Sequence, residues 1–231
     1  MKKAVQVVGY KGSGKSSLIK KLSATLQKKG YEVTVIKSAH EELSLNIKDS
    51  EMAKVCDKYI IVSPSQTLTF IPKELKFLQV VSLAEGDFLI LEGFKSINFI
   101  PRIVCLNKIE EKKELECGCE IAFWEKKNTE DQKKIENLVE LVESKGCLLG
   151  GLDCGECGNP DCKGLLQEIL KGDKTLDDCL PLQRKTTITI NGNNLPLSPF
   201  VATILVETFG GFVGSLKGAT KGEVVIKFEY K

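Results

Sequence analysis

Residues 9–16 read Gly9-Tyr10-Lys11-Gly12-Ser13-Gly14-Lys15-Ser16, which matches the pattern G-x-x-x-x-G-K-[S/T] at every fixed position. A valine-rich apolar run precedes this stretch, and leucine and isoleucine follow it at helical spacing. We therefore expect a buried strand, a loop and a helix in that order. Gly12 and Gly14 allow the backbone to turn its N–H groups inward around an anion, and the helix N-terminus adds the positive end of its dipole. The stretch predicts a loop that binds phosphate groups.

The other residue types of this loop suit a nucleoside triphosphate. Lys15 is expected to reach the β- and γ-phosphates, and the hydroxyl of Ser16 is expected to ligate Mg²⁺. A glycine-rich turn with a chance lysine is the alternative, which the flanking strand and helix disfavour. The predicted nucleotide-binding residues are Gly9, Lys11, Gly12, Ser13, Gly14, Lys15, Ser16 and Ser17.

The metal side of such a site needs a carboxylate at the end of a buried strand. Residues 88–91 are all apolar and lead directly to Glu92, so Glu92 is the predicted acid beside Mg²⁺. An ordinary strand-end carboxylate is the alternative. Asp49 is a second candidate, for which a helix N-cap is an equally good interpretation. No catalytic base can be identified, so hydrolysis, if any, is expected to be slow.

Strands and helices alternate along the first 145 residues, which predicts an α/β fold with a mostly parallel sheet. The chain then becomes rich in cysteine and glycine, and it ends with an alternating run, an Asn-Gly turn, a helix-like stretch and an apolar run at 224–228. We expect a nucleotide-binding domain, a small metal-held module and a small α+β module of unknown role, at 1–147, 148–184 and 185–231. The expected strands are 4–8, 32–37, 59–62, 68–71, 88–92, 102–106, 120–124, 186–190 and 224–228; the expected helices are 17–26, 49–56, 130–144, 165–171 and 199–209.

The composition excludes several classes of function. The 231 residues carry a formal net charge of only +2, so neither nucleic acid nor a membrane surface is an expected partner. No apolar run reaches the roughly 18 residues that a bilayer requires. The apolar part of the N-terminus is too short for a secretion signal and continues into the glycine loop, so we expect a cytoplasmic protein.

Four of the nine cysteines form a spaced motif. Cys154, Cys157 and Cys162 read C-x-x-C-x-x-x-x-C, and Cys179 follows after a predicted short helix. Four thiolates of this kind suit a [4Fe–4S] cluster or a tetrahedral zinc ion. Glycines after the first two cysteines favour the cluster, because they let backbone N–H groups turn toward sulfur. Free thiols or disulfides remain as a further alternative. Cys117 and Cys119 form only a C-x-C and are expected to be structural or surface cysteines.

The order of motifs in the first 145 residues resembles the MobB family, small GTP-binding adapters of molybdenum-cofactor biosynthesis. The resemblance rests on the glycine loop, residues 35–40, the Asp49-Ser50 pair and the Glu92-Gly93-Phe94-Lys95 strand end. It implies GTP with Mg²⁺ at Lys15, Ser16 and Glu92, a homodimer, and a supporting role in attaching GMP to molybdopterin. The family usually has several histidines after the second strand, where this chain has only His40.

Residues 154–179 resemble the four-cysteine iron–sulfur domain of RnfB-type electron-transfer subunits and corrinoid-enzyme subunits. The resemblance implies a [4Fe–4S] cluster on Cys154, Cys157, Cys162 and Cys179. The leading hypothesis is therefore a MobB-like GTP-binding adapter, with molybdenum- or tungsten-cofactor proteins as partners. A nucleotide-gated electron-transfer protein and a zinc-stabilised, nucleotide-switched binding module are the alternatives.

The identity of the base is less constrained than phosphate binding. Residues 107–110 read Asn107-Lys108-Ile109-Glu110 directly after a predicted strand, which resembles the N-K-x-D loop that reads guanine. Glu110 stands where that loop has aspartate, and the longer side chain displaces the carboxylate by about one C–C bond from a geometry that tolerates roughly half an ångström. A solvated loop is the other interpretation.

Overall fold

The computed structural model describes residues 3–39, 55–183, 186–190, 193–195, 197–220 and 222–226. Its centre is a five-stranded sheet in the order β2-β5-β1-β6-β7, and all four strand pairs are parallel. The predicted α/β fold with a mostly parallel sheet is confirmed. The strands are β1 (Lys3–Gly9), β2 (Val33–Lys37), β5 (Phe88–Glu92), β6 (Arg102–Leu106) and β7 (Glu120–Glu125).

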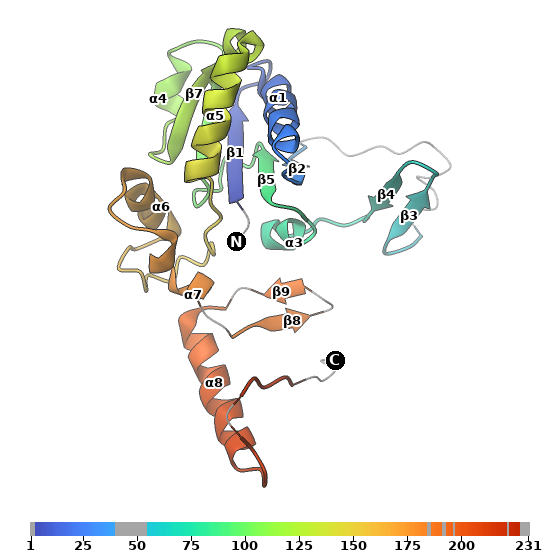
Figure 1. Ribbon diagram of the computed structural model, residues 1–231, viewed down its shortest axis with the longest axis vertical. Coiled ribbons are helices and arrows are strands. Elements are labelled where there is room, and N and C mark those ends of the chain that lie inside the picture. The colour runs from blue at the N-terminus through green and yellow to red at the C-terminus, as the bar shows by residue number, and fades with distance from the viewer. Residues whose placement is uncertain are drawn as a thin grey trace.

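Helices cover both faces of this sheet, which explains why β1, β5 and β6 are apolar almost throughout. On one face, α1 (Lys15–Lys28) and α5 (Gln132–Lys145) pack side by side (Figure 1). They bury leucine, isoleucine and valine against the odd-numbered positions of β1. The other face is covered by α3 (Phe77–Ser82) and α4 (Glu111–Leu115), against Leu89, Leu91 and Leu106 among others.

The carboxyl ends of three neighbouring strands bring the predicted nucleotide residues to one edge. β1 ends at Gly9 and pairs with both β5 and β6. Glu92 therefore lies at the end of the strand on one side of the glycine loop, and Asn107 follows the strand on the other side. Ligands of open parallel sheets bind at this edge.

A two-stranded hairpin lies apart from the sheet (Figure 1). Its strands β3 (Tyr59–Val62) and β4 (Thr67–Phe70) pair antiparallel, close to the predicted positions. The predicted helix at 49–56 falls mostly outside the described residues.

The cysteine module follows α5 and has its own small hydrophobic cluster. It contains α6 (Cys162–Lys171), a 3₁₀ turn η2 (Leu176–Asp178) and α7 (Leu180–Gln183). The predicted short helix begins three residues earlier than expected, because Asp161 caps it by accepting the N–H of Gly164 at 2.7 Å. Gly172 ends it in a left-handed conformation with φ 90°.

The last elements are a hairpin of β8 (Ile188–Ile190) with β9 (Asn193–Leu195) and the long helix α8 (Pro199–Gly214), which extends away from the other elements (Figure 1). The predicted strand at 224–228 is wrong for its described part. Residues 224–226 form no strand and are exposed. Their apolar side chains favour extended backbone, but a strand is stable only with a partner whose hydrogen bonds it completes.

α8 is mostly apolar, with Glu207 as its charged residue, and carries several exposed apolar side chains, among them Phe200, Ile204 and Phe212. Among the helices of the described residues, α8 included, none combines the length and the apolarity that a bilayer crossing requires.

Candidate functional site

The glycine loop joins β1 to α1 in a backbone conformation that leaves no room for side chains at two of its glycines. Gly9 has φ 153°, and a Cβ there would lie 2.4 Å from the carbonyl oxygen of Cys105. Gly14, which caps α1, adopts the left-handed conformation with φ 86°, and a Cβ there would meet the side chain of Lys126 at 3.1 Å. The chain thus needs glycine at both positions.

Lys15 lies at the first position of α1, and its ammonium group turns back over the loop. The Nζ atom donates to the carbonyl oxygens of Gly9 at 3.2 Å and Tyr10 at 2.8 Å. Neutral carbonyls do not balance the charge of the ammonium group. Charged phosphate oxygens are stronger acceptors, so Lys15 can exchange the carbonyls for them.

Ser16 and Glu92 meet across the strand edge, as the sequence predicts for a magnesium site. The Ser16 hydroxyl donates to Glu92 Oε1 at 3.0 Å. Glu92 is 9% exposed, and Lys37 at the end of β2 lies 3.4 Å from the same carboxylate oxygen. Both side chains open on a groove between α1 and β2. Mg²⁺ prefers oxygen ligands and keeps several of its water molecules. A hydroxyl and a carboxylate that face each other at a groove can bind the ion directly or through those waters.

The predicted base-reading loop lies beside the glycine loop. The Asn107 side-chain amide donates to the Lys11 carbonyl oxygen at 3.5 Å. The carboxylate that holds Asn107 is that of Glu111, which accepts its backbone N–H at 2.8 Å and its side-chain N–H at 3.2 Å. The backbone N–H of Asn107 lowers the pKa of Glu111. Glu110 is exposed at the start of α4 and makes no comparable bond among the described contacts.

Three side chains of this site are not predicted from the sequence: Lys37, Lys126 and Glu111. Lys37 is the last residue of β2 and Lys126 directly follows β7, and these are the two edge strands of the sheet. Their position at the carboxyl end of a parallel strand is the one sequence signal that could have indicated these lysines. Lysine is too common in this chain for that signal to be specific. His40 and Asp49 lie outside the described residues.

The four cysteines of the spaced motif line one small pocket in the second module. Cys154, Cys157, Cys162 and Cys179 surround it together with apolar side chains such as Leu152 and Leu165. Within the described ranges, no three cysteine, histidine or acidic side chains are grouped closely enough to hold one metal ion. The thiols therefore share a pocket without converging on a single point.

Backbone N–H groups and burial both act on the sulfur atoms of this pocket. The N–H of Asp153 donates to Cys162 Sγ at 3.4 Å, and the Asp153 carboxylate accepts the N–H of Cys162 at 2.8 Å. Burial raises the pKa of the Cys162 and Cys179 thiols, and backbone N–H groups oppose this rise. Gly155 and Gly158 adopt left-handed conformations with φ 75° and 82°, as a tightly turning ligand loop requires.

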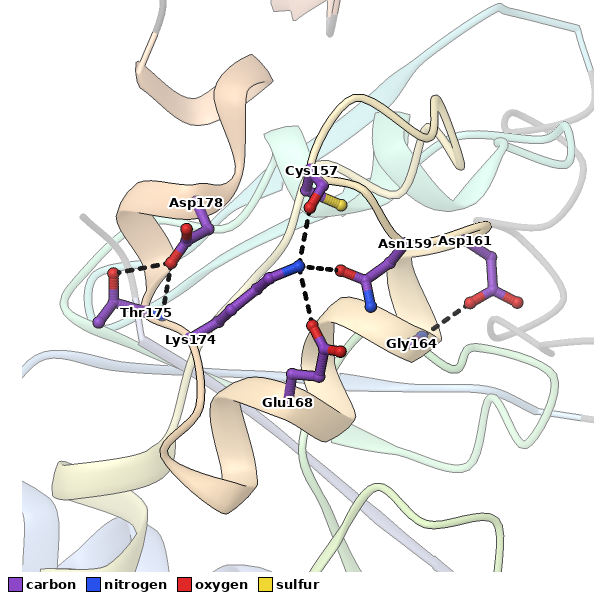
Figure 2. A network of polar contacts seen from close by, with 8 residues as sticks. All are labelled: Cys157, Asn159, Asp161, Gly164, Glu168, Lys174, Thr175 and Asp178. Atoms are coloured by element: carbon purple, nitrogen blue, oxygen red, sulfur yellow. Dashed lines mark hydrogen bonds and ion pairs between the residues drawn. The ribbon is translucent and has the colours of Figure 1, made fainter.

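Lys174 ties the cysteine loop to α6 (Figure 2). Its Nζ atom donates to the carbonyl oxygen of Cys157 at 2.8 Å and to Asn159 Oδ1 at 2.7 Å, and it pairs with Glu168 at 2.8 Å. The hydrogen bond to Glu168 raises the pKa of Lys174, and the same contact lowers that of Glu168. Lys174 thus holds the segment between the second and third cysteines against the helix that begins at Cys162.

These residues fit an iron–sulfur cluster. Four thiols face one pocket, the pocket is mainly apolar, and an N–H group already points to one sulfur. Cluster stability and potential depend on thiolate ligation, N–H···S bonds and burial. A zinc ion would need four sulfur atoms about 2.3 Å from one centre, which this arrangement does not offer without movement of the loop.

Comparison with known proteins finds matches to two parts of the chain. The family model MobB, "Molybdopterin guanine dinucleotide synthesis protein B", matches residues 4–123, just over half of the chain. The model FeS, "Putative Fe-S cluster", matches residues 149–181. The two matches lie on the sheet domain and the cysteine module in the order expected from the motifs.

Individual proteins and a solved structure are also similar to this chain. A protein of Methanocaldococcus jannaschii named "Putative molybdopterin-guanine dinucleotide biosynthesis adapter protein" is 28% identical over 96% of this chain and 95% of its own length. A subunit of the ion-translocating oxidoreductase complex of Cereibacter sphaeroides is 27% identical over 41% of this chain and 42% of its own. The crystal structure of Bacillus subtilis MobB covers 60% of this chain and 97% of that one, with 19% identity and a TM-score of 0.51, and thus shares the fold. The chain belongs to the MobB family.

Proposed function

We propose that the chain binds GTP with Mg²⁺ and acts as an adapter in the synthesis of molybdopterin guanine dinucleotide. The observation that carries this proposal is the carboxyl edge of the sheet, where Glu92 contacts Ser16 at one end of the glycine loop and Asn107 contacts Lys11 within it. Gly9, Lys11, Gly12, Ser13, Gly14, Lys15, Ser16 and Ser17 contact the nucleotide, and Ser16 and Glu92 hold the metal.

Asn107 supports guanine as the base. In an N-K-x-D-like loop, the asparagine must lie against the phosphate loop, as the bond to the Lys11 carbonyl places it. A carboxylate beside the asparagine then accepts the N1–H and N2–H₂ donors that guanine has and adenine lacks. Both oxygens of Glu111 already accept N–H groups of Asn107, so the exposed Glu110 is the carboxylate that reads the base.

A reconstituted reaction tests the adapter role. Molybdopterin, Mg²⁺–GTP and a nucleotidyltransferase that attaches GMP are combined with and without the chain, and the dinucleotide product is quantified. The chain is expected to raise the yield, and a variant that cannot bind phosphate, Lys15→Ala, is expected to raise it less. An unchanged yield with the unsubstituted chain contradicts the adapter role.

The change Glu92→Gln tests the metal side of the nucleotide site. It keeps the side-chain volume and the partner of Ser16 but removes the charge that attracts Mg²⁺ through its water shell. The gain in GTP affinity on adding Mg²⁺ is expected to fall on the order of tenfold. Titration of GTP at increasing Mg²⁺ measures it, with the exposed Glu74→Gln as the control. An unaltered Mg²⁺ dependence would remove Glu92 from the site.

We propose further that Cys154, Cys157, Cys162 and Cys179 hold a [4Fe–4S] cluster. Their common pocket and the match to an iron–sulfur family support this. When bound, the cluster supplies one-electron redox chemistry. The chain then has a nucleotide-binding domain at 1–147, an iron–sulfur domain at 148–184 and a small α+β module at 185–231.

Lys174 is expected to slow the loss of this cluster. Replacing it with methionine, which keeps most of the side-chain length, leaves the Cys157 carbonyl and the Asn159 side chain without their donor. Release of iron to a chelator is expected to become about tenfold faster, as for other residues that orient metal ligands. Lys171→Met, at the exposed C-terminal end of α6, is the matched control. Equal release rates in both variants would contradict this role.

The similarity to a subunit of an ion-translocating oxidoreductase favours a second candidate function, nucleotide-gated electron transfer. In that case the reduction potential of the cluster responds to Mg²⁺–GTP. An anaerobic redox titration with and without the nucleotide distinguishes the two functions, because a simple adapter shows the same potential in both.

A further inference from the structure

Two cysteines outside the four-cysteine pocket lie in one tight turn. Cys117, Gly118 and Cys119 connect α4 to β7, at the amino end of the strand and thus away from the nucleotide edge. Cys117 is partly exposed, whereas Cys119 is fully buried. Cys119 Sγ lies 3.4 Å from the carbonyl oxygen of Asn98.

The turn holds the two thiols together. The Glu120 carboxylate accepts the N–H of Cys117 at 2.6 Å and the N–H of Gly118 at 2.8 Å. Gly118 has φ 86°, and a Cβ there would lie 2.3 Å from the side-chain nitrogen of Gln167. The side chains of Cys117 and Cys119 are close enough for the Cys119 thiol to donate to the Cys117 thiolate. The backbone that a short cysteine–glycine–cysteine ring requires is therefore already formed.

The shared hydrogen bond gives the two thiols different chemistry. It lowers the pKa of Cys117 to about 7, with a further lowering by the Arg102 guanidinium. It is also the main cause of the raised pKa of Cys119, to which burial adds a smaller rise. Near neutral pH an accessible thiolate thus stands next to a protonated, protected thiol. This is the division of roles between an attacking and a resolving cysteine.

The turn also contacts the cysteine module. The side chain of Gln167, on the helix that begins with Cys162, donates to the carbonyl oxygen of Cys117 at 3.0 Å. Cys119 belongs to the same buried cluster as Cys162 and Cys179, and Cys117 packs against that cluster. Formation of a disulfide in the turn would thus change the contacts that the turn makes with α6.

We infer that Cys117 and Cys119 form a redox-active dithiol that exchanges with low-molecular-weight disulfides. The Cys117 thiolate attacks one sulfur of the small disulfide, forms a mixed disulfide and releases a thiolate, which takes up the proton of Cys119. Cys119, now a thiolate, attacks Cys117 Sγ, closes the intramolecular disulfide and releases the second small thiolate, which takes up a proton from water. Two protein thiols are oxidised, and one small disulfide is reduced to two thiols.

A peptide mass experiment on the full chain tests this inference. The chain is equilibrated anaerobically in mixtures of reduced and oxidised glutathione, alkylated and cleaved after lysine. The fragment 114–126 contains Cys117 and Cys119 as its only cysteines. As the oxidised fraction rises, this fragment is expected to lose both alkyl groups together and two hydrogens. Two alkylated cysteines throughout the range, or a persistent glutathione adduct on the unsubstituted chain, would overturn the inference.

Two variants separate attack from resolution. Cys119→Ala is expected to retain the glutathione adduct on Cys117, because the second step is lost, and to slow alkylation of Cys117 at pH 7. Cys56→Ser removes a cysteine that lies elsewhere in the sequence and is expected to change neither result. The unsubstituted chain alone decides the question if Cys119→Ala fails to fold. Rapid adduct loss in folded Cys119→Ala contradicts the role of Cys119.

Discussion

Replacing Lys15 with alanine is expected to weaken Mg²⁺–GTP binding about 100-fold. Within the described part of the chain, the Lys15 ammonium group donates to the carbonyl oxygens of Gly9 and Tyr10, and it can transfer these bonds to phosphate oxygens. Two hydrogen bonds to a charged acceptor contribute about 3 kcal/mol together, which corresponds to roughly a hundredfold in the dissociation constant. Calorimetric titration of the purified chain measures the change.

The exposed Lys21, on the same helix, offers the matched control. Lys21→Ala removes the same charge from α1 at a position that faces solvent and should bind GTP like the unsubstituted chain. Both variants should unfold at nearly the same temperature, because neither side chain belongs to the core. Equal affinity of Lys15→Ala and Lys21→Ala would show that the loop does not hold the phosphates as proposed.

The change Cys154→Ala is expected to abolish the cluster, with iron and acid-labile sulfide each falling at least about tenfold. Cys154 is one of four thiols around the pocket, and alanine offers no ligand in its place. The visible absorption of the cluster should disappear with the iron. GTP binding should persist, because the core beneath the glycine loop consists of residues outside the cysteine module.

Cys56→Ser serves as the control for this experiment, since Cys56 lies far along the chain from the motif. It should keep iron and sulfide at the level of the unsubstituted chain. Iron retained in Cys154→Ala would assign the cluster to other cysteines, and zinc without iron or sulfide in the unsubstituted chain would replace the cluster with a structural metal.

The sequence predicts the elements around the glycine loop because its signals there are local. The glycine loop depends on a strand, a turn and a helix that adjoin one another, and Glu92 follows four buried residues whose pattern predicts a central strand. The carboxyl ends of parallel strands lie at one edge of the sheet. The fold class therefore predicts that Ser16, after β1, and Glu92, at the end of β5, lie close together. The observed 3.0 Å bond agrees with that expectation.

Other contacts could not be predicted because they depend on how distant elements pack. Lys37 reaches Glu92 only because β2 pairs with β5, and Gln167 reaches Cys117 only because α6 packs beside the turn before β7. Lys174 lies three residues after the end of α6, and no sequence motif identifies it as a residue that contacts the cysteine loop. The sequence predicts only a structural or surface pair for the C-x-C turn, since the different environments of its two thiols arise from packing.

The preference for GTP over ATP tests the central claim most directly. The two nucleotides share the triphosphate that the glycine loop binds and differ at the base beside Asn107. Competition of ATP against bound GTP, with Mg²⁺ present, measures the preference in one experiment. We predict that GTP binds at least about 100-fold more tightly, since a site that hydrogen-bonds a base leaves polar groups unpaired with the wrong one. Equal affinity for the two nucleotides would contradict the assignment of the chain as a GTP-binding adapter.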